Sequence, residues 1–136
     1  MTFFQKRRVI LTYGRFDQFS AQHAIFLQQA SALGNELIIG CATDGFATSQ
    51  GLPCQTDLEQ RREILEHCRF VDRVIPLQDA DQIRTDIVNY NVSVLVMGHQ
   101  DQGAFENLQD VAQVHYLPRP FSMQIRDIAA NCVHYG

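Results

Sequence analysis

The sequence predicts an α/β fold in which a five-stranded parallel sheet carries helices on both faces. The first observation is a set of short apolar, β-branched runs, of which 8–13, 36–42 and 92–97 are the clearest. Runs without a polar face are typical of strands that are covered on both sides. The second observation is that segments with helical apolar spacing separate these runs, as in parallel sheets with right-handed crossovers. Together these patterns predict a single Rossmann-like domain over residues 1–136.

The N-terminal part reads as a strand, a crossover helix and a second strand. The first strand covers 8–13 and ends at Gly14, and the second covers 36–42. Between them, residues 21–33 place side chains of one stripe three and four positions apart, which indicates a helix with one buried face. That stripe consists of His23, Phe26, Ala30 and Leu33. The pair Gly34-Asn35 then provides a helix stop.

The alternation continues to the end of the chain. Thr56 and Glu59 have capping-box spacing and predict the start of a helix that turns Ile64, Leu65 and Cys68 toward the core. The same criteria predict further strands at 71–76, 92–97 and 112–117, and helices with apolar stripes within 83–90 and 125–132. Ligands of such sheets bind beyond the carboxyl ends of the strands, near the reversal of strand order. We therefore expect the site in the loops after the first, second and fourth strands.

Composition narrows the class of protein. The chain has 136 residues, of which 46% are hydrophobic and 19% charged, enough for one compact core. A formal charge of −4 provides no basic field for nucleic acid or an anionic membrane, and Lys6-Arg7-Arg8 is expected to be a solvated flank. No apolar run reaches the length of a membrane span or signal peptide, so a cytoplasmic location is expected. The four cysteines and the histidines lack metal-ligand spacing, so no protein metal site is expected.

Several collinear segments resemble the cytidylyltransferase family of the nucleotidyltransferase superfamily, and most closely its small bacterial glycerol-3-phosphate cytidylyltransferases. The main ones are Tyr13-Gly14-Arg15-Phe16-Asp17, His23 and Ala42-Thr43-Asp44, and the likeness extends over residues 8–128. Further matches are 59–66, 69–72, 74–76, 96–98 and 116–119. The resemblance implies transfer of CMP from CTP to a phosphorylated alcohol such as glycerol 3-phosphate, with release of pyrophosphate. It also implies Mg²⁺ as cofactor and a homodimer formed around 69–72.

The family signature His-x-Gly-His is degenerate in this chain, where it reads Ser20-Ala21-Gln22-His23. His23 is the expected catalytic imidazole, and a partly buried structural histidine is the alternative. Ser20 is a second catalytic candidate, with simple helix N-capping as the alternative. Gln22 replaces the glycine that lets the nucleotide approach the helix backbone. Its side chain is expected to narrow that site or to bond a different ligand.

Arg15 is the third catalytic candidate, because its guanidinium suits phosphate oxygens and it replaces a small hydroxyl residue of the family. A solvent-facing arginine is the alternative. Asp17 is expected to fix the turn through its own hydrogen bonds.

The acceptor site has lost charge relative to the family. The family carries lysines in the segment that matches 45–55, and this segment has no positive charge here. The resemblance leaves Asp44 and Arg61 for the acceptor, whereas Arg62 is expected to be solvated.

The nucleotide site combines positions that are retained with positions that have changed. After Gly98 the family's Asp-Asp-Trp is replaced, and the segment from Arg119 to Ser122 is shortened. Ser122 either presents a hydroxyl to a phosphate or only caps a helix. The resemblance implies nucleotide contacts at Tyr13, Gly14, Phe16, Gln22, Gly98, Arg119 and Ser122.

Two functions fit this pattern. The first is an active but impaired cytidylyltransferase, because each lost phosphate contact removes roughly 2–4 kcal/mol of transition-state stabilisation if it acts like an oxyanion donor. The second is an inactive family member that binds a ligand or a protein partner. We expect catalysis, where it occurs, to rest on positioning and positive potential rather than on a covalent intermediate.

Overall fold

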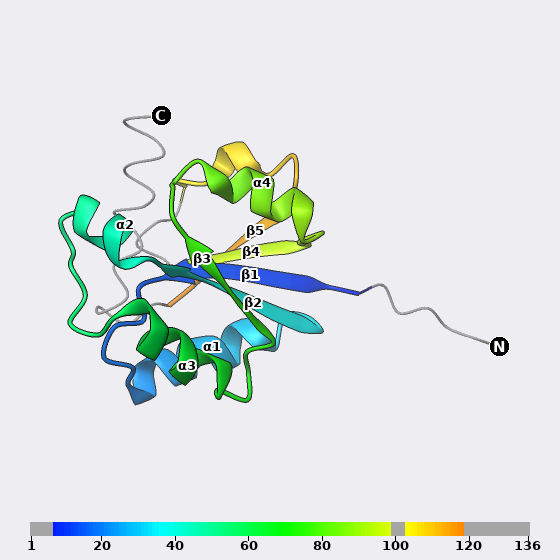
Figure 1. Cartoon of the computed structure of the whole chain (residues 1–136). Helices are drawn as coiled ribbons and strands as arrows, with labels where there is room; N and C mark the ends of the chain where they lie inside the picture. Colours follow the sequence, from blue (N-terminus) through cyan, green and yellow to red (C-terminus); the bar gives the residue numbers. More distant parts are fainter. Residues whose placement is uncertain (1–6, 99–102, 119–136) are drawn as a thin grey trace.

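A computed structural model describes residues 7–98 and 103–118. All five strands of its sheet run parallel in the order β3-β2-β1-β4-β5, which confirms the predicted fold class (Figure 1). The strands are β1 (Val9–Gly14), β2 (Glu36–Ala42), β3 (Arg73–Leu77), β4 (Val94–Gly98) and β5 (Gln113–Leu117). The helices are α1 (Ala21–Ser31), α2 (Asp44–Ser49), α3 (Leu58–Glu66), α4 (Gln82–Asn89) and the short 3₁₀ helix η2 (Glu106–Leu108).

Helices cover the sheet on both faces (Figure 1). On one face, α1 and α3 contribute Phe26, Leu27 and Leu65 to a buried cluster. On the other face, α4 contributes Ile83 and Ile87 to a second cluster, which also includes residues of α2 and η2. The strands lie between two apolar layers, and this explains why they read as continuous apolar runs.

The strand order reverses beside β1. From the central β1 the chain moves outward through β2 to β3, and later places β4 and β5 on the other side. β1 ends at Gly14 and its neighbour β4 ends at Gly98, so the predicted switch point lies between these two carboxyl ends.

One glycine is required by the packing of the sheet. A Cβ at Gly40 would lie 2.2 Å from the ring of Tyr13, its partner in the β1–β2 register. Only a hydrogen atom fits at this position in β2.

Three local expectations were wrong. The connection after the second strand is not wholly the expected loop, because α2 occupies Asp44–Ser49. The start of α3 is capped by Asp57, whose carboxylate accepts from the N–H of Gln60 at 2.9 Å, rather than by Thr56. Ile64 is 44% exposed, because Arg61 and Leu65 take the buried side of α3 and the adjacent position points elsewhere.

The remaining boundaries agree closely with the pattern. α1 ends at Ser31, two positions before the predicted end at Leu33, and β3 begins two positions after the predicted start at Val71. The helix predicted within 125–132 lies outside the described residues. No helix in the described part of the chain is long and apolar enough to cross a membrane.

Candidate functional site

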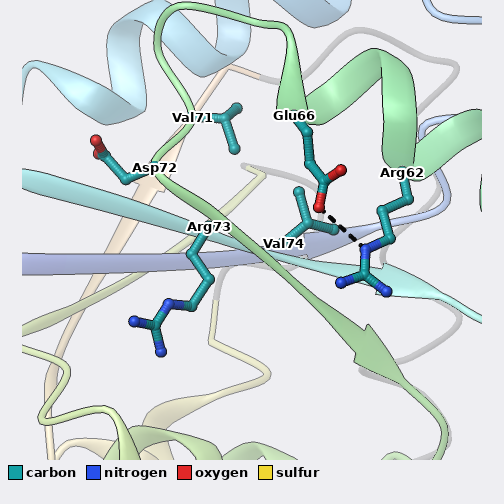
Figure 2. A pocket seen from close by; sticks show the side chains of 6 residues that line it. All are labelled: Arg62, Glu66, Val71, Asp72, Arg73 and Val74. Carbon is teal, nitrogen blue, oxygen red and sulfur yellow. Dashed lines mark hydrogen bonds and ion pairs between the residues drawn. The ribbon is translucent and has the colours of Figure 1, made fainter.

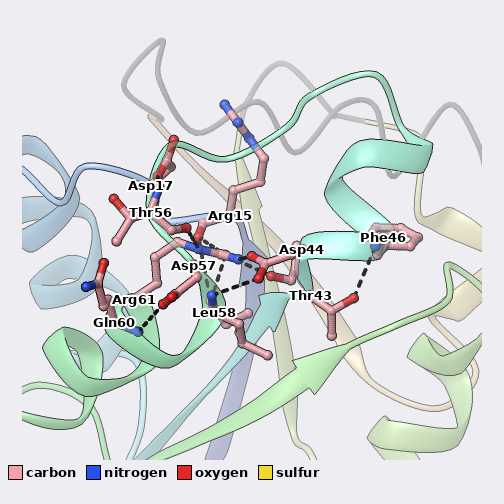
Figure 3. Close-up of polar contacts among 12 residues, drawn as sticks. Arg15, Asp17, Thr43, Asp44, Phe46, Thr56, Asp57, Leu58, Gln60 and Arg61 are labelled. Carbon is pink, nitrogen blue, oxygen red and sulfur yellow. Dashed lines mark hydrogen bonds and ion pairs between the residues drawn. The ribbon is translucent and has the colours of Figure 1, made fainter.

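The candidate site lies at the carboxyl edge of the sheet, where the turn after β1 meets the segment that follows β2. Figure 3 shows the polar contacts that join these two regions. The turn covers residues 14–20 and leads into α1, and the second region contains α2 and the connection to α3.

The turn is held by the side chain of Phe16, whose ring packs against Gly14 of the same turn. Phe16 has a φ of 52° and is only 2% exposed, and a Cβ at Gly14 would lie 2.9 Å from its ring. A positive φ at a phenylalanine is strained, so the surrounding packing must hold it there. Gly14 and Phe16 are therefore placed to shape the turn, and their implied contacts with a nucleotide stay predictions.

His23 is fixed at the start of α1. Its Nδ1 accepts a hydrogen bond from the backbone N–H of Ser20 at 2.9 Å, and the Oγ of Ser20 lies 3.1 Å from the same nitrogen. The ring stacks on Phe19 at 5.4 Å and lies 5.8 Å from Phe16, between centroids, and His23 is 1% exposed. Because Nδ1 accepts, a neutral imidazole carries its proton on Nε2.

The other two positions of the degenerate motif are solvent-accessible. Ser20 is the N-cap of α1, and Ser20 and Gln22 are both exposed. Both lie at the helix end where backbone N–H groups and the helix dipole favour an anion.

Asp17 joins the turn to the segment before α3. Its carboxylate accepts from the N–H groups of Gln55 at 2.8 Å and Thr56 at 3.0 Å, so it holds a distant segment as well as the turn. Burial is the largest single influence and raises the pKa of this carboxyl. The two N–H bonds, the Thr56 side chain and the charge of Arg15 together outweigh burial and leave its pKa lowered.

Arg61 is the centre of the polar network in Figure 3. It is 1% exposed, and its guanidinium donates to the carbonyl oxygens of Thr56, Arg15 and Ala42, each at 2.8 Å. Its Nη2 donates to a carboxylate oxygen of Asp44 at 2.7 Å. The buried arginine therefore fixes the ends of β1 and β2 to the start of α3, and its implied role at the acceptor stays a prediction.

Asp44 is the first residue of α2. Its side chain is 56% exposed, although one oxygen accepts from Arg61 and the other from the N–H of Leu58 at 3.3 Å. Of the two residues implied for the acceptor, Asp44 is thus the one that a ligand can reach directly.

The side chain of Arg15 contacts the connection between α2 and α3. Its backbone carbonyl is held by Arg61, whereas its Nη1 donates to the carbonyl oxygens of Leu52 at 3.1 Å and Pro53 at 3.4 Å. Figure 3 shows its side chain turned away from the Arg61 guanidinium, toward the connection between α2 and α3.

The other predicted nucleotide residues are more scattered. Tyr13 is fully buried on the α4 side of the sheet, where its hydroxyl donates to Asp86 at 2.8 Å. Its backbone is thus closer to the turn than its phenol, and its nucleotide contact stays a prediction. Gly98 ends β4 beside Leu117 of β5. Arg119 and Ser122 lie outside the described residues.

Sequence reasoning missed Cys41 as part of the site. Its Sγ lies 3.4 Å from Nη1 of Arg61, and its thiol donates to the carbonyl of Arg15 at 3.6 Å. Burial raises the pKa of the Cys41 thiol to about 11, despite the nearby guanidinium. Its position at the end of β2 was a possible signal, but an isolated cysteine in an apolar strand does not predict a polar partner.

Within residues 7–98 and 103–118, no three His, Cys, Asp or Glu side chains are grouped to hold a metal ion. Both oxygens of Asp17 and of Asp44 already accept hydrogen bonds. The described residues therefore do not form a protein cage for Mg²⁺, which commonly binds through substrate phosphates instead.

A second depression lies beside the amino end of β3 (Figure 2). It is lined by Arg62, Glu66, Val71, Asp72, Arg73 and Val74. Arg62 pairs with Glu66 at 3.1 Å, and Asp72 accepts from the N–H of Leu37 at 2.8 Å. It lies at the end of β3 opposite to the carboxyl edge, so it is separate from the candidate site.

Two glycerol-3-phosphate cytidylyltransferases are similar to this chain over most of their length. It is 38% identical to a glycerol-3-phosphate cytidylyltransferase of Bacillus subtilis over 81% of this chain and 85% of the relative. It is 37% identical to a glycerol-3-phosphate cytidylyltransferase of Staphylococcus aureus, over 81% of this chain and 83% of that protein. It is also 35% identical to an FAD synthase of Archaeoglobus fulgidus, over 63% of this chain and 61% of that protein.

A solved structure shares the fold at much lower sequence identity. The lipopolysaccharide core biosynthesis protein of Thermoplasma volcanium has a TM-score of 0.74 and 16% identity, over 85% of this chain and 99% of that chain. In sequence, residues 11–130 match the family described as Cytidylyltransferase-like. The resemblance carried by the turn, the start of α1 and the end of β2 is thus confirmed, and the chain belongs to the cytidylyltransferase-like family of nucleotidyltransferases.

Proposed function

We propose that this protein transfers CMP from CTP to a phosphorylated alcohol such as glycerol 3-phosphate and releases pyrophosphate. The observation that carries this proposal is the meeting of the turn after β1, the N-terminus of α1 and Asp44 at the carboxyl edge of the sheet. The relatives named glycerol-3-phosphate cytidylyltransferase support the choice of nucleotide and acceptor.

The chemistry requires two anions to be brought together. A phosphate oxygen of the acceptor attacks the α-phosphorus of CTP, and the bond from that phosphorus to the oxygen bridging to the β-phosphate breaks. We propose that the N-terminus of α1 and His23 stabilise negative charge on the nucleotide phosphates. Arg61 acts indirectly, because it fixes the loops on which the other groups stand.

The proposed site is less positive than that of an enzyme with the complete signature. Ser20 offers a hydroxyl where the family has a histidine, and segment 45–55 supplies no cation. We therefore propose slow turnover, with Mg²⁺ entering on the triphosphate rather than in a cage of protein ligands. We also propose that the protein acts in the cytoplasm.

The test is pyrophosphate release by the purified chain with CTP, glycerol 3-phosphate and Mg²⁺. The expected result is turnover that requires both substrates, with a CDP-alcohol as product. ATP with a flavin mononucleotide acceptor is the matched comparison, because an FAD synthase is also among the relatives. Absence of turnover across a panel of nucleotides and phosphorylated alcohols would contradict the proposal.

The alternative is an inactive family member that binds a ligand or partner. It is favoured by Arg61, whose guanidinium is buried and bonded to three carbonyls and a carboxylate. This alternative predicts no affinity for triphosphates, so calorimetry with CTP separates the two functions.

We propose that the protein is a homodimer whose interface includes residues 69–72. The neighbouring depression in Figure 2 carries both arginines and carboxylates, and a mixed patch of this kind suits a self-complementary two-fold contact. Light scattering should give twice the chain mass of 15.5 kDa. Arg69→Glu is expected to lower this mass and the exposed Arg84→Glu to leave it unchanged. A wild-type monomer would reject the dimer.

A further inference from the structure

The carboxyl edge has two arginines among the described residues that contact it, and they differ in what they can offer a ligand. Arg61 is buried, and its donors are directed at Thr56, Arg15, Ala42 and Asp44. Segment 45–55 contains neither lysine nor arginine. Among the described residues, Arg15 is therefore the arginine that could offer its donors to a phosphate between the turn and this segment.

The contacts of Arg15 leave donor capacity for such a phosphate. Its Nη1 bonds to the neutral carbonyls of Leu52 and Pro53, at 3.1 and 3.4 Å. Its Nε is buried and has no hydrogen-bond partner in the described part of the chain. A buried N–H without a partner is costly, and a guanidinium bonds more strongly to an oxyanion than to a neutral carbonyl.

The backbone of Arg15 is fixed while its side chain spans two regions. Its carbonyl oxygen accepts from Arg61 at 2.8 Å and from the thiol of Cys41 at 3.6 Å, which anchors the residue to β2 and α3. The side chain then crosses to residues 52 and 53. A change of partner at the guanidinium can thus occur without movement of the turn.

We propose that Arg15 is an anion-binding residue of this site, and that it exchanges the carbonyls of Leu52 and Pro53 for a phosphate group. When the side chain leaves these carbonyls, its Nε and a terminal nitrogen can bond two phosphate oxygens side by side. The inference deepens the proposed function and rests on it for the identity of the substrates. The phosphate belongs either to the acceptor monoester or to the nucleotide, and the experiment separates these two sources.

The experiment measures the affinity of wild type, Arg15→Gln and Arg84→Gln for glycerol 3-phosphate, pyrophosphate and CTP by calorimetry. Arg84→Gln is the matched control, because it removes the same charge from an exposed position on α4, outside both the candidate site and the proposed dimer contact. We expect Arg15→Gln to lose about 10- to 100-fold in affinity for at least one anion, as for a lost charge-assisted bond, with the control unchanged. A loss for glycerol 3-phosphate alone assigns the acceptor, and a loss for pyrophosphate and CTP assigns the nucleotide.

The outcome is separable from that of the proposed function. If no turnover occurs but Arg15→Gln weakens anion binding, the proposed reaction fails and the inference stands. The inference would be overturned if wild type and Arg15→Gln bound the anions with equal affinity. It would also be overturned if wild type bound none of the three anions. If the glutamine variant does not fold, Arg15→Lys replaces it in the experiment. Because lysine cannot make the two-pronged contact, the anion affinity of Arg15→Lys should fall about tenfold. An unchanged affinity would contradict the proposal.

Discussion

The two regions that border the site are held in place by different forces. The turn after β1 and the start of α1 are fixed by packing, with Phe16 and His23 buried beside Phe19. The segment from α2 to α3 is fixed through its backbone, whose carbonyl and N–H groups form hydrogen bonds with side chains of the turn and of α3. These side chains are Arg15, Asp17 and Arg61.

This difference shows how the segment of residues 45–56, which carries no charged side chain, keeps its shape. Two of the three side chains that hold it belong to the turn, so the turn determines the position of the segment. Arg61, Arg15 and Asp17 bind its carbonyl and N–H groups, and such groups need a partner when water is excluded. Substitutions in the turn should therefore alter the segment, whereas substitutions remote from these contacts should not.

The largest effect is expected from Arg61→Met, which keeps apolar volume but removes the donors to three carbonyls. We expect the free energy of unfolding to fall by about 3–5 kcal/mol, because these carbonyls lose their partner in the interior. Urea unfolding measures the change. Arg62→Met, on the exposed side of the same helix, should stay within about 0.5 kcal/mol of wild type. Equal losses for both variants would show that Arg61 is not the anchor of the segment.

Gly14→Ala tests the packed region. Its Cβ would lie 2.9 Å from the Phe16 ring, so the ring or the turn must shift, at a cost of about 1–3 kcal/mol. Gly45→Ala is the matched control, since its Cβ would meet nothing within 4 Å. That control lies in α2 and should be neutral or stabilising by up to about 1 kcal/mol. Thermal unfolding of the two variants decides whether packing holds the turn.

The sequence was sufficient for the fold because the strands are buried on both faces, and continuous apolar runs then mark them directly. Prediction from the sequence failed where a local structure depends on contacts that only the folded chain forms. α2 was missed because six residues with little apolar pattern follow a strand, and their helix depends on the capping oxygen of Thr43. A sequence also cannot show that backbone carbonyls surround the guanidinium of Arg61, whose implied role at the acceptor stays a prediction.

Asp17→Asn tests the backbone-held region through pH. The pKa of Asp17 is lowered below its ordinary value of 3.8, so its stabilising effect is present above that pH and is lost as pH falls through the folded-state pKa. We expect Asp17→Asn to lose about 1 kcal/mol at pH 7, because an amide cannot accept both N–H bonds equally well. The difference from wild type should shrink below pH 4. A difference that is constant between pH 7 and pH 3 would contradict the role of the carboxylate.

The smallest effect on stability, and the sharpest on function, is expected from Gln22→Gly at the exposed start of α1. Glycine there should cost roughly 0.5–1 kcal/mol of helix stability, and the same cost is expected from Gln29→Gly, farther along the exposed side of α1. If the glutamine side chain narrows the nucleotide site, its removal should raise CTP affinity by up to about tenfold, and Gln29→Gly should not. Calorimetry on both variants compares the two positions directly. Unchanged CTP affinity in Gln22→Gly would mean that weak nucleotide binding arises from the missing charge of the α2–α3 segment, and not from steric obstruction at the helix.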